Sequence, residues 1–468
     1  MLPRLLLLTL AAALVGAAPH EPADELRAEV QEAQLQYKGA QVLRVEAVSE
    51  FQKDVIKKMQ DEQVLDTWLN PAAGRTHVDI MVPATALDQV KAELQNVSAT
   101  FRVMIADVEA AIKDENPALS ESELEELEGR KVGKALRSAP AFPWRRRTTQ
   151  LVTPYNTLFC CNKRGHRMTF QNYHRVSDIH GYLDYLAQTF PDLVSVQTIG
   201  SSVEGRPLKL IKITGAKAGP KPAFYIDGGI HAREWISPAS VTYIIQELVE
   251  NREKYPFADS IDYYIVPVVN PDGYEFTHNG VRLWRKNRKD AQKGRCAGTD
   301  LNRNFGYKWG GAGSSRDPCQ EIYAGSGPFS EPETQAIRNF VSSLGTTVRG
   351  YVTFHSYGQY ILYPWGYDKK VPPDYTDLDR IGKKAANKMR EVGGASYTVG
   401  NSASLLYAAS GGADDWAKGG PRVKYTYTIE LRDRGRFGFL LPANYILPTG
   451  KEALAAIQTI SEEIAATG

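Results

Sequence analysis

The spacing of apolar residues divides the chain into a small unit and a large one. Between about 36 and 114, apolar runs at 41–45, 64–69, 78–82 and 100–105 predict strands. Apolar residues at helical spacing predict two amphipathic helices, near 51–59 and 87–97. The order strand, helix, strand, strand, helix, strand is that of a split βαβ open sandwich. The first unit is therefore expected to be a small α+β fold.

The large unit begins near 168 and has a different pattern. Its predicted strands are continuous apolar runs at 194–199, 208–214, 223–226, 262–269, 350–355 and 425–429, with helical stretches between many of them. Strands that are apolar on both faces are typical of a sheet covered by helices on both sides. We expect one α/β domain over 168–468, since about 300 residues suffice for a single core of this kind.

The N-terminus has the pattern of a secretory signal peptide. Arg4 precedes an apolar run at 5–15, and small residues at 16–18 offer a cleavage site after Ala17 or Ala18. The run is too short to span a bilayer, and no later stretch is long and apolar enough to do so. We expect 1–17 to be removed from a secreted, extracellular protein with no membrane partner. The alternative is a buried first helix.

The stretch at 116–167 separates the two units. Its first part, 120–128, is strongly acidic and expected to be helical, whereas 130–167 carries clustered basic residues without a period. The basic sites at 145–147, 163–164 and 167 are targets for a trypsin-like protease, and such linkers are where nicking concentrates. An activation segment, a flexible connector and a retained intron all remain open, the last because Cys160 and Cys161 are adjacent.

The composition and charge of the chain give no indication of nucleic acid as a partner. The net charge is +2, with 24% charged and 43% hydrophobic residues, and the basic residues are dispersed, so nothing favours nucleic acid. Secretion permits disulfides. Cys296 and Cys319 would close a modest loop, worth about 3 kcal/mol. Asn96 begins a possible glycosylation sequon.

Three residues could form a metal site. His231 and Glu234 are three residues apart after a predicted strand, and a helix starting there would place both side chains on one face. His355, at the end of another strand, is the candidate third ligand. A catalytic zinc needs three protein ligands and one open position. The HxxE spacing alone is common by chance, and a lone strand-end histidine is usually structural.

The surrounding motifs carry more weight, because six of them resemble, in order and spacing, the zinc carboxypeptidases of the A and B group. They are His231-Ala-Arg-Glu234-Trp, Asn270-Pro-Asp-Gly-Tyr274, Arg282-Leu-Trp-Arg285-Lys, Asp300-Leu-Asn302-Arg303-Asn304, His355-Ser-Tyr and Glu430-Leu-Arg-Asp433.

The resemblance implies a carboxypeptidase-like fold, with a mixed, mostly parallel sheet behind a pro-domain at 18–115. It also implies one Zn²⁺ per catalytic domain and peptide or protein substrates with a free C-terminus. A trypsin-like protease would activate the precursor at Arg164 or Arg167, with Arg147 as the alternative. We expect a monomer.

The resemblance also implies residue roles. Glu430 matches the general base, which takes a proton from water and later gives it to the leaving amine. Arg285 matches the group that stabilises the developing oxyanion. Arg303, with Asn302 beside it, matches the clamp on the terminal carboxylate, for which a planar guanidinium is suited. Tyr407 matches a tyrosine that closes over the substrate end.

Substrate preference is expected to depend on Asp414. B-type enzymes of the family carry aspartate at the matching position and A-type enzymes an apolar residue, so a preference for terminal Lys or Arg is favoured. An A-type preference remains open, because Leu362 and Leu406 keep the expected pocket wall apolar and Asp415 could be the inward residue instead. Arg233 and Phe439, with Tyr357, match positions in more remote subsites.

Three rival classes can be compared with this hypothesis. A non-catalytic binding protein on the same fold would usually have lost a ligand or the base, and this chain keeps them. An aminopeptidase would have no use for Arg303 with Tyr407, which suit a substrate carboxylate. A structural or adhesion protein would need neither set of residues.

Overall fold

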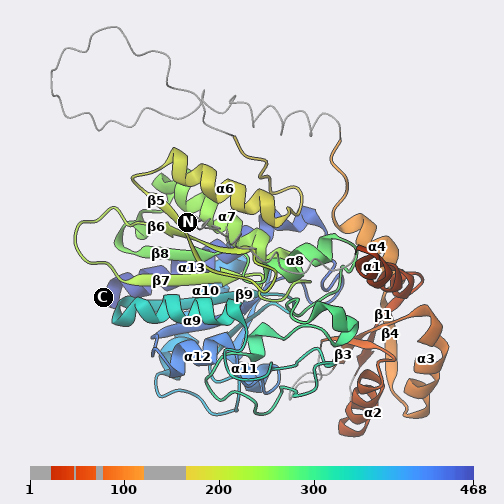
Figure 1. Ribbon diagram of the computed structural model, residues 1–468. Coiled ribbons are helices and arrows are strands. Elements are labelled where there is room, and N and C mark those ends of the chain that lie inside the picture. Colours follow the sequence, from red (N-terminus) through yellow and green to blue (C-terminus); the bar gives the residue numbers. More distant parts are fainter. Residues whose placement is uncertain (1–22, 47–48, 70–76, 121–164, 468) are drawn as a thin grey trace, which may run out of the picture.

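Two sheets organise the computed structural model, which describes residues 23–46, 49–69, 77–120 and 165–467 (Figure 1). One sheet belongs to a small N-terminal unit, which lies beside the large unit that holds the other. The expected signal peptide, Cys160 and Cys161, the basic sites up to Arg164 and nearly all of the acidic helix lie outside the described residues. No helix in the described ranges is long and apolar enough to cross a bilayer.

The N-terminal unit is a four-stranded antiparallel sheet with strand order β2-β3-β1-β4. Leu43 and Val45 of this sheet pack with α2 and α3 on one face, while Val42, Trp68 and Met81 pack on the other face against the large unit. The predicted small α+β fold is therefore confirmed. Its elements are β1 (Gln41–Glu46), α2 (Glu50–Asp61), β2 (Asp66–Leu69), β3 (His77–Val82), α3 (Leu87–Asn96), β4 (Thr100–Ile105) and α4 (Val108–Glu115).

A further helix, α1 (Ala23–Tyr37), precedes this unit and was not predicted. Only a narrow stripe of it is apolar. Val30, Ala33 and Tyr37 recur at helical spacing and pack against the large unit. The buried Tyr37 hydroxyl accepts a hydrogen bond of 3.1 Å from the Leu283 backbone N–H.

The large unit is an eight-stranded mixed sheet with strand order β11-β10-β12-β9-β7-β8-β6-β5. Its centre, β12-β9-β7-β8, is parallel, while β5, β6 and the β10–β12 pair are antiparallel. The predicted mixed sheet is confirmed. The strands are β5 (Val194–Ser201), β6 (Pro207–Ile213), β7 (Ala223–Gly228), β8 (Asp262–Val266), β9 (Val348–His355), β10 (Tyr360–Tyr363), β11 (Thr398–Asn401) and β12 (Tyr425–Glu430).

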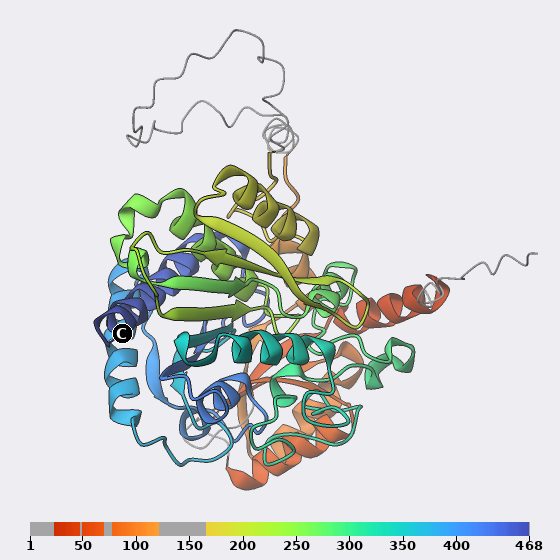
Figure 2. The same ribbon diagram turned by 60° about the vertical axis from the view of Figure 1, so that its left-hand side comes forward.

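Helices cover both faces of this sheet, as Figure 2 shows from a second side. Alternate residues of one strand enter different cores: Phe224 and Ile226 pack on one face, and Ala223 and Tyr225 on the other. The first face is covered by α6 (Val176–Thr189), α7 (Ile236–Glu250), α10 (Tyr375–Gly393) and α13 (Ile446–Thr467), and the second by α9 (Pro332–Ser343) and α12 (Ala413–Gly419). The remaining short helices include α8 (Pro271–His278) and α11 (Ser402–Leu405).

Two local expectations were wrong, and two short strands were not predicted. His231 and Glu234 do not lie in a helix but in a turn, because α7 begins only at Ile236. The strand expected at 262–269 ends at Val266. The four-residue strands β10 and β11 were not predicted, since such short runs carry little periodic signal.

Candidate active site

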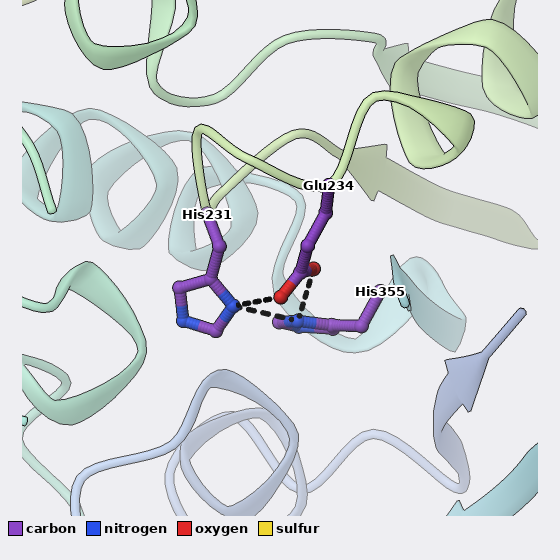
Figure 3. Close-up of side chains that lie close together, drawn as sticks. All are labelled: His231, Glu234 and His355. Atoms are coloured by element: carbon purple, nitrogen blue, oxygen red, sulfur yellow. Dashed lines mark hydrogen bonds and ion pairs between the residues drawn. The ribbon is translucent and has the colours of Figure 1, made fainter. Parts of the chain in front are cut away.

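Three side chains converge on one point where β7 and β9 end (Figure 3). His231 Nδ1 lies 2.8 Å from Glu234 Oε1. His355 Nδ1 lies 3.2 Å from Glu234 Oε2 and 3.1 Å from His231 Nδ1. All three residues are buried, and their ligand atoms lie within 4.8 Å of one another. Residues 124 positions apart in the chain, His231 and His355, are therefore brought into contact.

The arrangement suits a divalent cation. Two imidazole nitrogens face each other with a carboxylate between them, and four-coordinate ligands about 2 Å from zinc lie roughly 3.3 Å apart. Burial opposes ionisation of Glu234, yet the two imidazoles hold its pKa below the ordinary range. Two ring nitrogens and a carboxylate oxygen are presented together, which is a donor set that zinc accepts.

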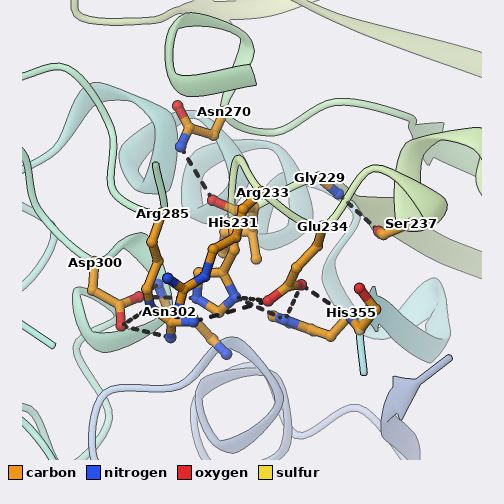
Figure 4. A network of polar contacts seen from close by, with 12 residues as sticks. Gly229, His231, Arg233, Glu234, Ser237, Asn270, Arg285, Asp300, Asn302 and His355 are labelled. Atoms are coloured by element: carbon orange, nitrogen blue, oxygen red, sulfur yellow. Dashed lines mark hydrogen bonds and ion pairs between the residues drawn. The ribbon is translucent and has the colours of Figure 1, made fainter. Parts of the chain in front are cut away.

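The turn that carries His231 and Glu234 is fixed by its neighbours. Gly229 has a φ of 66°, and a Cβ there would come 2.8 Å from Pro238 Cγ, so only glycine fits without strain. The Gly229 N–H donates to Ser237 Oγ at 2.9 Å (Figure 4). Asn270 Nδ2 donates to the Ile230 carbonyl at 3.3 Å. The ends of β7 and β8 therefore hold the loop that presents both side chains.

Asp300 links the first histidine to an arginine. Its Oδ1 lies 3.1 Å from His231 Nε2, and its Oδ2 accepts from Arg285 at 2.9 Å. Burial would raise the pKa of Asp300, but Arg285, Arg303 and His231 hold it well below the ordinary range. The sequence places Asp300 in a motif but does not indicate a role for it. In the structure it lies at one end of the polar network, in contact with both His231 and Arg285 (Figure 4).

The arginines and Tyr407 lie on the same cleft. Arg285, Asn302, Arg303, Tyr407 and Glu430 all line the cavity that contains the three candidate ligands. Arg303 is buried and donates through Nε to the Gly313 carbonyl and through Nη1 to the Asn302 carbonyl, both at 2.8 Å. Its guanidinium lies 5.9 Å from the Tyr407 ring centroid. Two guanidinium groups, a tyrosine and a carboxylate therefore surround the three candidate metal ligands, which we call the metal-type triad.

The two neighbouring aspartates are placed differently. Asp414 lines the cleft and is 6% exposed. Asp415 is fully buried, and its oxygens accept from the Gly366 and Tyr367 N–H groups at 2.7 and 2.8 Å. Burial raises the pKa of Asp414, and among the described residues no Lys or Arg forms an ion pair with it. The other cleft residues near it include Leu362, Gly366, Ser402, Leu406 and Ala409.

The N-terminal unit covers the mouth of this cleft. Trp68 and Leu69 of β2 line the cavity together with Tyr357 and Phe439, and the Trp68 and Phe439 rings lie 5.2 Å apart. Arg233 Nη1 donates to Asp66 Oδ2 at 3.0 Å, and its guanidinium lies 4.3 Å from the Phe439 ring. The residues expected in remote subsites are therefore in contact with the N-terminal unit.

Comparisons with known proteins agree with this geometry. The family model for zinc carboxypeptidases matches residues 179–456, and the model for the carboxypeptidase activation peptide matches residues 43–115. The chain therefore belongs to the zinc carboxypeptidase family. It is a metallocarboxypeptidase that carries an activation peptide, which is the organisation of a zymogen acting on peptides after proteolysis.

Similar proteins include both A-type and B-type members. A carboxypeptidase B of Astacus astacus is 45% identical over 296 residues, covering 63% of this chain and 97% of that protein. A carboxypeptidase A2 of Mus musculus is 34% identical over 432 residues, covering 91% and 94%. The crystal structure of thrombin activatable fibrinolysis inhibitor has a TM-score of 0.76 and 31% identity, covering 92% of this chain and 100% of that chain.

Proposed function

We propose that the chain is a secreted, monomeric zymogen whose catalytic domain binds one zinc ion and releases C-terminal Lys or Arg. His231, Glu234 and His355 would hold the metal, and their mutual contacts support this assignment. Bound zinc supplies Lewis-acid chemistry that polarises the scissile carbonyl and acidifies a water. The other steps belong to side chains of the cleft.

Different side chains of the cleft carry out different steps of the reaction. Glu430 takes a proton from the attacking water and returns it to the leaving amine. Arg285, which is held by Asp300, faces the oxygen that becomes negative in the transition state. Arg303 and Asn302 hold the terminal carboxylate, and Tyr407 covers it. This positions the last peptide bond alone, because an internal bond has no carboxylate to offer.

The preference for basic ends rests on Asp414. A carboxylate that lines the cleft, is 6% exposed and has no basic ion-pair partner among the described residues is costly to keep ionised. A substrate Lys or Arg would supply the missing cation. The alternative, an A-type preference, is supported by the apolar wall of Leu362 and Leu406.

Activation requires removal of the N-terminal unit, with the signal peptide at 1–17 lost earlier. The proposed activation segment is 116–167. Arg167 is half-buried and the following Met168 is buried, so a first cut before this point, at Arg164 or Arg147, is favoured over a cut at Arg167. N-terminal sequencing of the trypsin-activated enzyme identifies the bond that is cut.

The test uses trypsin-activated protein and peptides that end in Arg, Lys, Phe or Leu, with and without a chelator. We expect release of Arg and Lys, loss of activity with chelator and recovery with zinc. Release of Phe or Leu but not Arg would overturn the B-type assignment, and release of no residue would overturn the enzyme proposal.

Two variants separate charge from shape. Asp414→Asn keeps the size of the side chain and should lower kcat/KM for terminal Arg by about 100-fold, because it removes one partner of a desolvated charge pair. Asp414→Ile should shift preference towards apolar ends. An unchanged preference in both variants would show that Asp414 does not contact the terminal side chain.

A further inference from the structure

Thr353 lies behind the second histidine of the triad. His355 turns its Nδ1 towards Glu234 and His231, and its other ring nitrogen, Nε2, lies 3.3 Å from the Thr353 hydroxyl oxygen. His231 has a corresponding partner, since its Nε2 lies 3.1 Å from Asp300. Histidine ligands usually donate their second N–H to a carboxylate, a carbonyl or a water, which fixes the ring. For His355, that neighbour is a hydroxyl.

Strand geometry places a carboxylate behind this hydroxyl. Thr353 and His355 are two residues apart on β9, so their side chains leave the same face of the sheet. On the adjacent parallel strand β7, Asp227 is the register partner of Thr353. Asp227 and Thr353 are both fully buried. The side chains of Asp227, Thr353 and His355 therefore lie in a row on one face of the sheet.

Asp227 is held as an acceptor. The Tyr351 hydroxyl donates to Asp227 Oδ2 at 3.1 Å. Burial raises the pKa of Asp227 to about 6, and its Oδ1 is buried with no hydrogen-bond partner among the described residues. Among the described residues, no Lys or Arg is in ion-pair contact with this carboxylate. Its Oδ2 is thus held by a hydroxyl group, while its Oδ1 is an acceptor without a donor on the strand next to Thr353, its register partner.

The proton directions along this row are consistent. A metal-facing Nδ1 must offer its lone pair, so the proton of the neutral ring is on Nε2. This N–H can donate to the Thr353 oxygen, and the Thr353 hydroxyl can then donate its own hydrogen to Asp227. In this row the His355 ring donates, Thr353 accepts and donates, and Asp227 accepts.

We propose that Thr353 and Asp227 are positioning residues that hold His355 in the tautomer and orientation that present Nδ1 to a divalent ion. The inference rests on the proposed metal site and extends it to two residues behind it. Asp300 contacts His231 directly, whereas in this proposal Asp227 acts on His355 through the Thr353 hydroxyl. The loss of that hydroxyl should therefore weaken metal binding without removing a ligand.

The experiment measures zinc affinity of the full-length zymogen, freed of metal, by competition with a fluorescent chelator. Thr353→Val keeps the shape and removes the hydroxyl, and we expect about 10-fold to 100-fold weaker binding. Thr353→Ser restores the hydroxyl and should bind within about threefold of the parent chain. The control is Thr426→Val, another buried strand threonine, whose hydroxyl donates to the Val423 carbonyl at 3.2 Å and not to the site.

A double-variant cycle tests the link to Asp227. If Asp227 acts through Thr353, Asp227→Asn weakens zinc binding in the parent chain and has little further effect when Thr353 is already Val. The absorption spectrum of the cobalt-loaded zymogen should change in Thr353→Val and not in Thr426→Val. Melting temperatures of the metal-free proteins check that each variant folds. If Thr353→Val does not fold, Thr353→Ser and Asp227→Asn provide the test.

Parent-like zinc affinity in Thr353→Val would overturn the proposal. Equal losses in Thr353→Val and Thr426→Val, or additive losses in the double variant, would do so as well. Because no substrate is used, an incorrect B-type assignment leaves these measurements unaffected. A parent chain that binds no zinc would instead refute the proposed metal site itself.

Discussion

Glu115 and Arg282 form a buried bidentate ion pair between the N-terminal unit and the large unit. Glu115 ends α4, and both of its oxygens accept from the Arg282 guanidinium at 2.6 Å. Both side chains are almost fully buried. Arg282 also donates to the carbonyls of Arg233 and Phe439, at 2.8 Å each. The pair therefore connects the end of the activation peptide to the rim of the cleft.

The first prediction concerns this pair. Glu115→Gln leaves a buried guanidinium without its anion, and breaking a buried pair from one side costs about 3–5 kcal/mol. The uncleaved zymogen should become less stable and should hydrolyse a small substrate faster. The activated enzyme, which has lost Glu115, should be unchanged. The control is Glu109→Gln on the same helix, where the pair with Lys113 is exposed and worth less than about 1 kcal/mol.

The second prediction concerns Asp66 and Arg233. Asp66→Asn removes the anion that holds Arg233 at 3.0 Å, and because Asp66 is 24% exposed the loss should be modest, about 1–2 kcal/mol. The measurement is the activity of the intact zymogen on a short peptide relative to that of the activated enzyme. We expect a rise of about fivefold to 30-fold in that ratio, which corresponds to the same free energy. Asp61→Asn on α2, whose partner Lys57 is exposed, serves as the control and should leave the ratio unchanged.

The third prediction concerns the disulfide. Cys296 and Cys319 are joined, and the closed loop contains Asn302, Arg303 and Gly313, whose carbonyl accepts from Arg303. Replacing both cysteines with alanine should lower stability by about 3 kcal/mol on the chain-entropy model. It should also raise KM more than it lowers kcat, because the carboxylate clamp lies inside the loop. An unchanged KM with a lowered melting temperature would limit the disulfide to a role in stability.

Much of the fold followed from hydrophobic period alone. In the N-terminal unit, apolar runs and helical spacing predicted six elements in the correct order, because the apolar residues of these strands and helices recur at regular intervals. Helix α1 was not predicted because only three of its residues, Val30, Ala33 and Tyr37, form the apolar stripe that packs against the large unit. The short strands β10 and β11 are fixed by pairing with β12 and with each other, which local pattern does not report.

The site depended on long-range contacts that the sequence could suggest only through resemblance. His231 and Glu234 were selected for a helical spacing, yet they meet in a turn that Gly229 and Ser237 shape. Asp300 received no role, because nothing local shows that a loop carboxylate reaches His231 Nε2. The sequence also leaves the choice between Asp414 and Asp415 open, because local pattern does not show that Asp415 accepts from two backbone N–H groups while Asp414 lines the cleft.

The last prediction concerns the dependence of stability on pH. Glu333 of α9 is fully buried, accepts from the Val203 N–H at 3.0 Å, and burial raises its pKa to about 7. An acid whose pKa is higher in the folded than in the unfolded chain binds its proton more tightly when folded. Its contribution to stability is therefore complete below the unfolded pKa of 4.5 and is lost as pH rises through about 7. The free energy involved is about 3 kcal/mol.

Melting temperatures of the zymogen between pH 4.5 and 8 should fall less steeply for Glu333→Gln than for the parent chain. Glu391→Gln, which removes an exposed carboxylate from α10, is the control. Parallel profiles for the parent and Glu333→Gln would show that Glu333 does not titrate in this range.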